Sequence, residues 1–198
     1  MGKAQNIVMR KSQVTLLGIS CFFSTNIWAQ EEDPALMFNE VDYRLYWNVN
    51  MGIVVPDDDI RLNEANVFDI RVGKHFTDNW ALEFELMRDE YDFDIDYDLK
   101  HYSTGMNFMY TNHDPLWKPY FLVGLGAIYS DSRYPSSIQS TDMIVNLAVG
   151  GSWYFTGNGV RLRVEARSRL DTNDSDLPGQ DGFGDGQFTI GIIVPIGD

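Results

Sequence analysis

The segment 160–171 constrains the fold most, because its residues alternate strictly between two kinds. Its even positions, from Val160 to Leu170, are apolar or small, whereas all of its odd positions are charged. Successive side chains of a β-strand point to opposite faces of the sheet. The segment therefore predicts a strand with one apolar face and one charged face.

The same period of two recurs along the chain and predicts eight strands. Each is about as long as a tilted strand must be to cross a bilayer. The predicted strands are 42–55, 65–77, 80–91, 99–111, 118–131, 142–156, 160–171 and 185–197. We therefore expect an all-β fold, an eight-stranded antiparallel transmembrane up-and-down β-barrel.

The residues that share a face with the charges distinguish a membrane barrel from a soluble one. A soluble sandwich or lipocalin-like barrel would turn its apolar residues inward and its charges to water. Here the strand charges share a face with small residues such as Gly73 and Ala81, while the opposite face carries large apolar residues. A narrow barrel interior requires small side chains or paired charges. We expect the charged face to line the lumen and the apolar face to meet lipid.

The lengths of the links between strands agree with this interpretation. The links 77–79, 112–117 and 156–159 are short, and the last contains the turn-forming pair Asn158-Gly159. The alternate links are predicted to be longer and polar, and the longest is 172–184. Short periplasmic turns and longer outer loops are typical of these barrels, and an even number of strands places both termini on the periplasmic side.

The first 29 residues have the order of a secretory signal peptide. Positive charges within 3–11 precede an uncharged apolar core over 14–23, and Ala29 supplies the small residue for cleavage. A cytosolic N-terminal helix would not require this order. Lipidation at Cys21 is disfavoured because Gly18 stands where a lipobox has an aliphatic residue. We expect 1–29 to be a signal peptide, 30–41 a periplasmic N-terminal segment, and 42–198 a barrel in the outer membrane of a Gram-negative cell.

Composition excludes several other classes of function. The chain has 15 Lys and Arg against 29 Asp and Glu, a net charge of −14, which argues against a nucleic-acid partner. Its one cysteine excludes a disulfide framework or a thiolate metal cluster. His75 and His113 have no metal-ligand spacing. We therefore predict no metal site and no cofactor.

Aromatic residues of the apolar face gather near the short links. Such a band, or girdle, is typical of the membrane interface, where amphipathic rings are favoured. The predicted girdle is Tyr43, Phe76, Trp80, Phe108, Tyr110, Phe121, Trp153 and Phe155.

The charges of the inner face predict a network of ion pairs, because a buried charge requires a partner. Glu83 and Arg163 are expected at similar depth on opposite strands. The predicted network is Arg44, Asp69, Arg71, Glu83, Glu85, Arg161, Arg163, Glu165, Arg167 and Arg169. It is interpreted as a structural plug, and the alternative is a gate that opens when the pairs exchange.

The outer links carry most of the negative charge. Examples are Asp57 to Asp59, the alternating run 91–98, and 171–176. A solvated, repulsive surface is the simpler interpretation. The alternative is that these links bind divalent cations that bridge to lipopolysaccharide phosphates, since such cations take oxygen ligands. The segment 171–176 partly matches a calcium loop but lacks its sixth-position glycine and its distal Glu.

Three stretches together resemble the N-terminal β-barrel domain of the outer membrane protein A family, in particular the OprF-like porins. They are 76–85 (FTDNWALEFE), 118–130 (KPYFLVGLGAIYS) and 146–169 (NLAVGGSWYFTGNGVRLRVEARSR). The resemblance implies an outer-membrane barrel that stabilises the envelope, with weak pore activity. It also implies outer-membrane lipids, lipopolysaccharide and the barrel assembly machinery as partners.

The C-terminal residues depart from the family pattern. Two-domain members continue into a periplasmic peptidoglycan-binding domain, and stand-alone barrels usually end on an aromatic residue. Asp198 is not aromatic, and Phe188 is the last aromatic residue in the sequence. We expect either a following domain in the native protein or an atypical assembly signal. Pro195 removes one hydrogen-bond donor from the closing strand, which is tolerable only near the rim.

An enzyme is the alternative function. His101 and Ser103 have the His-x-Ser spacing of barrel lipid A deacylases, although Thr104 stands where that motif usually has Asn. A Ser–His pair can supply a nucleophile and a base. The alternation turns both residues toward the lumen, whereas a lipid hydrolase requires them to face the bilayer. We therefore expect no catalytic residues and no enzymatic activity.

Overall fold

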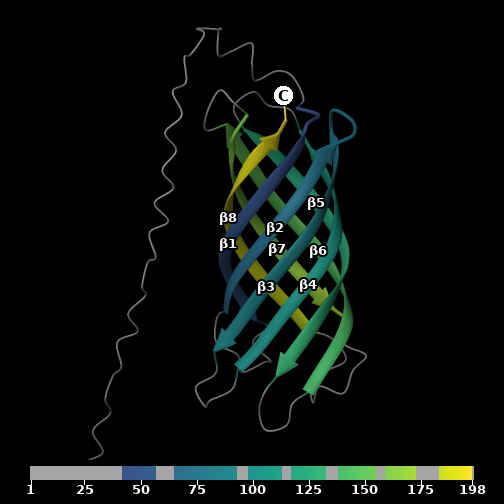
Figure 1. Cartoon of the computed structure of the whole chain (residues 1–198), viewed down its shortest axis with the longest axis vertical. Helices are drawn as coiled ribbons and strands as arrows, with labels where there is room; N and C mark the ends of the chain where they lie inside the picture. The colour runs from purple at the N-terminus through teal and green to yellow at the C-terminus, as the bar shows by residue number, and fades with distance from the viewer. Residues whose placement is uncertain are drawn as a thin grey trace, which may run out of the picture. The chain divides into compact units, whose positions relative to one another are not determined.

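The alternating segments form eight strands in a computed structural model of the chain (Figure 1). They are β1 (Leu45–Pro56), β2 (Ala65–His75), β3 (Trp80–Asp92), β4 (Asp98–Thr111), β5 (Lys118–Ser132), β6 (Ile138–Tyr154), β7 (Arg161–Asp171) and β8 (Phe183–Ile196). The structure describes residues 42–56, 65–92, 98–112, 117–132, 138–154, 159–172 and 183–197. Within these ranges no helix is long and apolar enough to span a membrane. The predicted signal peptide and residues 30–41 lie outside them.

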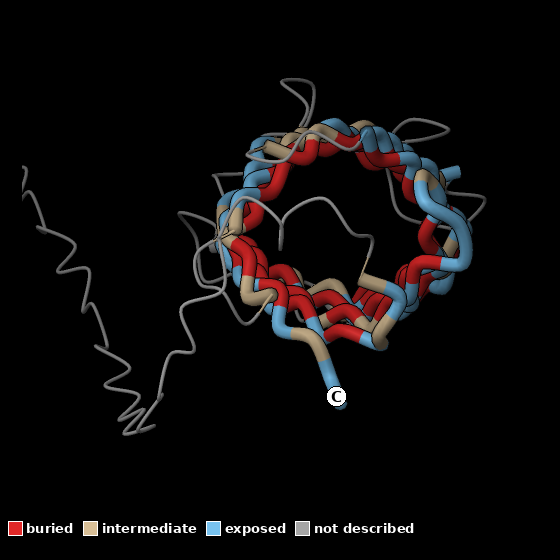
Figure 2. Tube along the Cα trace, turned by 90° about the horizontal axis from the view of Figure 1, so that it is seen from above, coloured by how far each residue is buried: buried red, intermediate tan, exposed pale blue. Residues whose placement is uncertain are grey.

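Each strand pairs antiparallel with the next, and β8 pairs with β1, so the sheet closes into a barrel. The closing ladder runs from Leu45 opposite Ile196 to Pro56 opposite Asp185. Figure 2 shows the ring from one mouth. Closure gives the backbone N–H and C=O groups of every strand a neighbour on both sides, which a sheet surrounded by lipid requires. The predicted fold class is confirmed.

The side chains alternate between the lumen and the outer surface as predicted. In β7 the buried positions are those of the charged residues, from Arg161 to Arg169, while Val164, Ser168 and Leu170 are exposed. In β3, Glu83 and Glu85 are buried, whereas Phe84 and Leu86 are exposed. A polar interior inside an apolar outer wall is the inverse of a soluble barrel and matches a barrel in lipid.

The largest differences from the predicted strand bounds are at the starts of β1 and β6. β1 begins at Leu45 rather than at residue 42, because its ladder with β8 stops at Ile196 and Gly197 has a φ of 86°. β6 begins at Ile138 rather than at residue 142, because Ile138 and Ser132 extend the hairpin of β5 and β6. The β5–β6 link is therefore shorter than expected.

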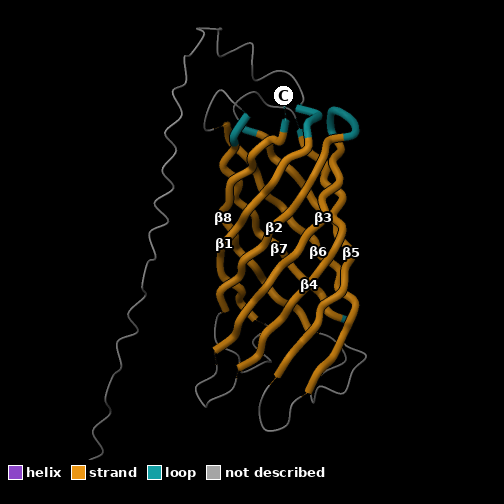
Figure 3. The backbone as a smooth tube through the Cα atoms, viewed as in Figure 1, coloured by secondary structure: helices purple, strands orange, loops and turns teal. Residues whose placement is uncertain are grey.

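The two ends of the barrel are distinct. The link 76–79, residues 112 and 117 beside the ends of β4 and β5, and Gly159–Val160 before β7 lie at one end, with the start of β1 and the end of β8 (Figure 3). We call it the short-turn end and the opposite end the loop end. Of the links at the loop end, only Thr172 lies within the described ranges. We expect the short-turn end to face the periplasm, as short turns do in barrels of the outer membrane.

Candidate functional site: the charged lumen

Arg71 of β2 is the cation at the centre of the lumen, and only 1% of it is exposed. Its guanidinium contacts four carboxylates. The Nε atom lies 2.9 Å from Oδ1 of Asp69 and 2.8 Å from Oε2 of Glu85, and Nη1 lies 2.9 Å from Oε2 of Glu165. Glu83 is more distant, with Oε2 3.5 Å from Nη1. Arg71 thus joins acidic residues of β2, β3 and β7.

Two arginines of β7 reach across the lumen to β3. Nη1 of Arg163 lies 2.6 Å from Oε1 of Glu83, and Nη2 of Arg167 lies 2.6 Å from Oε2 of Glu85. Both arginines also bind Glu165, at 2.6 and 2.9 Å. These contacts join seven side chains, which we call the central network. Its members are Asp69, Arg71, Glu83, Glu85, Arg163, Glu165 and Arg167.

The central network holds three guanidinium groups and four carboxylates, so it carries one excess negative charge. All seven residues are at most 4% exposed. Hydrogen bonds between charged groups are shorter and stronger than neutral ones, and bidentate pairs such as Arg167 with Glu85 also fix the geometry. The arrangement can therefore hold charged side chains rigidly across the barrel interior.

Two tyrosines complete this network, and the charge pattern alone did not reveal them. The Tyr46 hydroxyl donates to Oε1 of Glu83 at 2.8 Å. The Tyr120 hydroxyl donates to Glu165 at 2.7 Å and accepts from Nε of Arg163 at 2.8 Å. Both tyrosines occupy inward positions of the alternation, which is the signal that could have found them.

A second group of charges, the outer cluster, lies toward the loop end. Nη2 of Arg169 lies 2.7 Å from Oδ2 of Asp89 and 2.5 Å from Oδ2 of Asp185, and 3.3 Å from the Tyr91 hydroxyl. Nδ1 of His101 lies 3.3 Å from Oδ2 of Asp89. Because β3 and β7 both run toward the loop end, this cluster lies beyond the central network. The predicted network included Arg169 but neither of these two acidic partners, Asp89 and Asp185.

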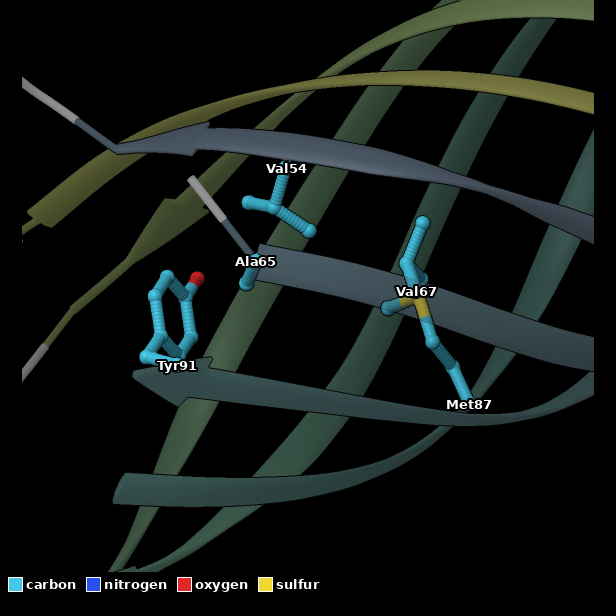
Figure 4. Close-up of a cluster of buried hydrophobic side chains, with 5 residues drawn as sticks. All are labelled: Val54, Ala65, Val67, Met87 and Tyr91. Atoms are coloured by element: carbon cyan, nitrogen blue, oxygen red, sulfur yellow. The ribbon is translucent and has the colours of Figure 1, made fainter. Parts of the chain in front are cut away.

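Apolar side chains fill another part of the lumen near the loop end (Figure 4). Val54 of β1, Ala65 and Val67 of β2, and Met87 and Tyr91 of β3 form one buried cluster. Tyr91 belongs to this cluster and also contacts Arg169, so the apolar cluster and the outer cluster adjoin. The interior is thus packed with apolar groups as well as ion pairs.

Two predicted members of the charge network lie elsewhere. Arg44 precedes β1 and binds Asp42 and the carbonyl of Gly197, because its backbone lies beyond the last rung of the closing ladder. Burial acts to raise the pKa of Asp42, but the hydrogen bonds and charge of Arg44 outweigh it and hold that pKa below its usual value. The guanidinium of Arg161 is buried near the short-turn end and lies 5.7 Å from the ring centre of Tyr46, a cation–π contact.

The aromatic residues predicted for the girdle point outward. Trp80 and Tyr110 face each other across β3 and β4, with ring centres 5.1 Å apart. The Tyr43 hydroxyl donates to Asp78, and this hydrogen bond raises the pKa of Tyr43. The exposed girdle residues are Tyr43, Phe76, Trp80, Phe108, Tyr110, Phe121 and Trp153. Phe155 lies outside the described residues.

His101 and Ser103 both face the lumen. Ser103 is 6% exposed, and His101 packs its ring against Tyr91 and its Nδ1 against Asp89. This orientation is opposite to the one that a hydrolase acting on membrane lipid requires. Within the strands and turns described, no group of three or more His, Cys, Asp or Glu side chains is arranged to hold a metal. The acidic links 57–64 and 173–182 lie outside the described ranges.

The family model "Outer membrane protein beta-barrel domain" matches residues 22–193. The chain belongs to this family. An outer-membrane location follows from that membership. No curated protein sequence matches the chain significantly.

Solved structures similar to this barrel include small outer-membrane proteins. Neisserial surface protein A is 16% identical, with a TM-score of 0.66, over 77% of this chain and 97% of that one. The N-terminal barrel of Pseudomonas aeruginosa OprF is 16% identical, with a TM-score of 0.48, over 75% and 97%. The outer membrane enzyme PagL is 13% identical, with a TM-score of 0.49, over 75% and 99%. The likeness to neisserial surface protein A supports the fold.

Proposed function

We propose that this protein is a structural barrel of the outer membrane whose central network acts as a plug, and that it lets ions pass only rarely. The observation that supports this proposal is the set of seven interlocked, buried charges that spans the lumen from β2 and β3 to β7. A passing ion would have to separate at least one of these pairs.

The size of that barrier can be estimated. Leaving one partner of a buried ion pair unpaired costs about 3–5 kcal/mol. At about 1.4 kcal/mol per tenfold change, such a cost corresponds to an open fraction between about 10⁻² and 10⁻⁴. Rare openings of this kind would give weak porin-like conductance, and the family resemblance implies the same. A freely conducting pore would require a lumen without this network.

Conductance of the purified barrel in a planar bilayer tests the proposal. We expect a nearly silent wild type and a clear leak in Glu83→Ala and Arg163→Ala, because each variant removes one partner of the 2.6 Å pair across the lumen. Lys74→Ala is the matched control, since Lys74 is an exposed cation on the outer face of β2. Frequent openings of the wild type that either lumen variant alters would instead support a pore gated by lumen charges.

The enzyme alternative requires His101 and Ser103 to meet lipid. Their inward orientation favours a non-enzymatic barrel. A lipid A deacylation assay on the wild type and Ser103→Ala tests it directly. We expect no activity in either protein, and activity that Ser103→Ala abolishes would establish the enzyme.

A further inference from the structure

The first residues of β6 extend beyond the end of its neighbour β7. β6 has 17 residues and β7 has 11. The ladder between the two strands ends at Ile144 opposite Asp171, whereas β6 begins at Ile138. Figure 1 shows the start of β6 beyond the arrowhead of β7 at the loop end. Among the described residues, none pairs with 138–141 on the side of β7, and we call this side of 138–141 the open edge.

The same residues are held on their other side by β5. The ladder of β5 and β6 continues to Ser132 opposite Ile138, so this part of β6 keeps an extended conformation. A strand that is paired on one side only presents backbone N–H and C=O groups on the other, and these groups are a template for a further strand. The open edge is therefore shaped in advance for a partner in extended conformation.

The contact at the end of β7 shows which backbone groups point toward the open edge. The carbonyl of Met143 accepts a hydrogen bond from the backbone N–H of Thr172 at 3.0 Å. Successive residues of an antiparallel strand direct their backbone groups to alternate sides. Thr141 and Gln139 therefore direct theirs to the same side as Met143, beyond the position of Thr172. Each has one N–H and one C=O group to offer to an incoming strand.

The open edge lies beyond the apolar outer wall of the barrel. The outward residues Leu147 and Met143 of β6 are exposed and apolar, whereas the next two outward residues, Thr141 and Gln139, are exposed and polar. The apolar band of such barrels marks the depth of the hydrocarbon. The open edge is therefore expected in water on the outer side of the membrane, where a segment of another protein can reach it.

The sequence around the open edge is acidic. From Asp171 to Asp185 the chain has five aspartates and no lysine or arginine. The stretch 128–143, which contains the hairpin of β5 and β6, has Asp131 and Asp142 against Arg133. Complementary charges favour one partner over another and speed its association. A basic segment is therefore the better partner for this edge, and a second copy of this chain, with the same aspartates, is a poor one.

We propose that the open edge of β6 binds an extended, basic peptide segment of another protein, which adds a strand to the sheet beyond the end of β7. The backbone groups of Gln139 and Thr141 hold the segment, and its lysine or arginine side chains lie near the aspartates. In this mode of recognition main-chain hydrogen bonds supply the affinity. The proposal is independent of whether the lumen conducts.

The first experiment measures binding of a short labelled peptide, in which Lys alternates with Val, by fluorescence anisotropy. The barrel is held in nanodiscs of phosphatidylcholine, so that the lipid offers the peptide no net charge. We expect this peptide to bind, a Glu–Val peptide to bind more weakly, and a Lys–Val peptide with methylated backbone nitrogens not to bind. Equal binding of the methylated peptide would overturn strand addition, and equal binding of the Glu–Val peptide would overturn the choice of a basic partner.

The second experiment changes the backbone of the open edge. Thr141→Pro removes one N–H donor and should weaken binding of the Lys–Val peptide at least about fivefold, the usual worth of one hydrogen bond. Thr141→Ala is the matched control, because it removes the side chain but keeps the donor, and it should bind as the wild type does. Heat resistance on a gel checks that both barrels are folded. Equal loss of binding in the two variants would show that the side chain, and not the backbone, is recognised.

A third measurement needs no substitution. Amide hydrogen exchange, followed by NMR, should be faster at Gln139 and Thr141 than at Ser140 and Asp142, whose backbone groups point toward β5. The Lys–Val peptide should slow exchange at Gln139 and Thr141 at least tenfold. Slow exchange at these two residues without peptide would show that another part of this chain or a second copy covers the edge, and would overturn the proposal. So would exchange that the peptide leaves unchanged.

Discussion

Arg71→Met is the substitution from which we expect the largest loss of stability in the lumen. The arginine contacts Asp69, Glu83, Glu85 and Glu165, so its removal leaves four carboxylates with two guanidinium groups. Breaking a buried ion pair by removing one partner costs about 3–5 kcal/mol. We expect the free energy of unfolding to fall by at least that amount, since more than one carboxylate loses its partner.

A second substitution distinguishes this explanation from a simple packing defect. In Arg71→Met, Asp69 keeps the hydrogen bond from Nδ2 of Asn50 at 2.5 Å but loses its ion-pair partner. Asp69→Asn removes that uncompensated charge and leaves an amide oxygen to accept the same bond. The double variant should therefore recover about 1–3 kcal/mol relative to Arg71→Met alone, the usual penalty for a buried unsatisfied group.

Urea unfolding in lipid vesicles, followed by tryptophan fluorescence, measures both effects. Trp47, Trp80 and Trp153 point outward, so their emission reports the loss of the lipid environment. Lys74→Met is the matched control on the same strand and should change the stability little. A stability of Arg71→Met within about 1 kcal/mol of the wild type, well below the expected loss, would refute the reasoning. So would a double variant no more stable than Arg71→Met.

Two further predictions concern barrel closure and the outer cluster. Gly52→Ala should prevent formation of the heat-resistant barrel on a gel, because a Cβ atom there would overlap the backbone carbonyl of Phe188 on β8. Gly186→Ala, where the nearest atom is 3.7 Å away, should fold normally, and equal behaviour of the two variants would contradict this. Arg169→Met should destabilise the barrel by about 3–5 kcal/mol, because it leaves Asp89 without its arginine partner. The Arg169→Met barrel should still give no leak in a planar bilayer, because its central network is intact. A leak as large as that of Arg163→Ala would show that the outer cluster is the main barrier to ions.

Local alternation was sufficient to predict the strands and the direction in which their side chains point. In β7 the charged residues from Arg161 to Arg169 occupy every second position, and any other register would place them in lipid. The strand ends were less predictable. The start of β6 at Ile138 depends on its pairing with Ser132 of β5, which alternation in one segment does not encode.

Membership of the charge network was predictable only in part. Arg163 and Glu83 were identified because both are inward and at similar positions in their strands, and their atoms lie 2.6 Å apart. Arg44 was also predicted as a member, but its side chain binds Asp42 and the carbonyl of Gly197 beyond the end of the ladder with β8. The alternation of one segment does not encode where that ladder ends. Tyr46 and Tyr120 were missed because a hydroxyl has no charge to draw attention to it.

The sequence by itself determined that this chain forms a closed barrel with an apolar exterior and a charged interior, because period-two alternation is a local property of each strand. The tertiary structure decided which charges meet. Arg71 on β2 and Glu165 on β7 are 94 residues apart in sequence and do not pair through any ladder, yet their side chains lie 2.9 Å apart across the lumen. Only closure of the ring brings these two walls within the reach of a side chain, and the distance between them depends on the registers of all eight ladders.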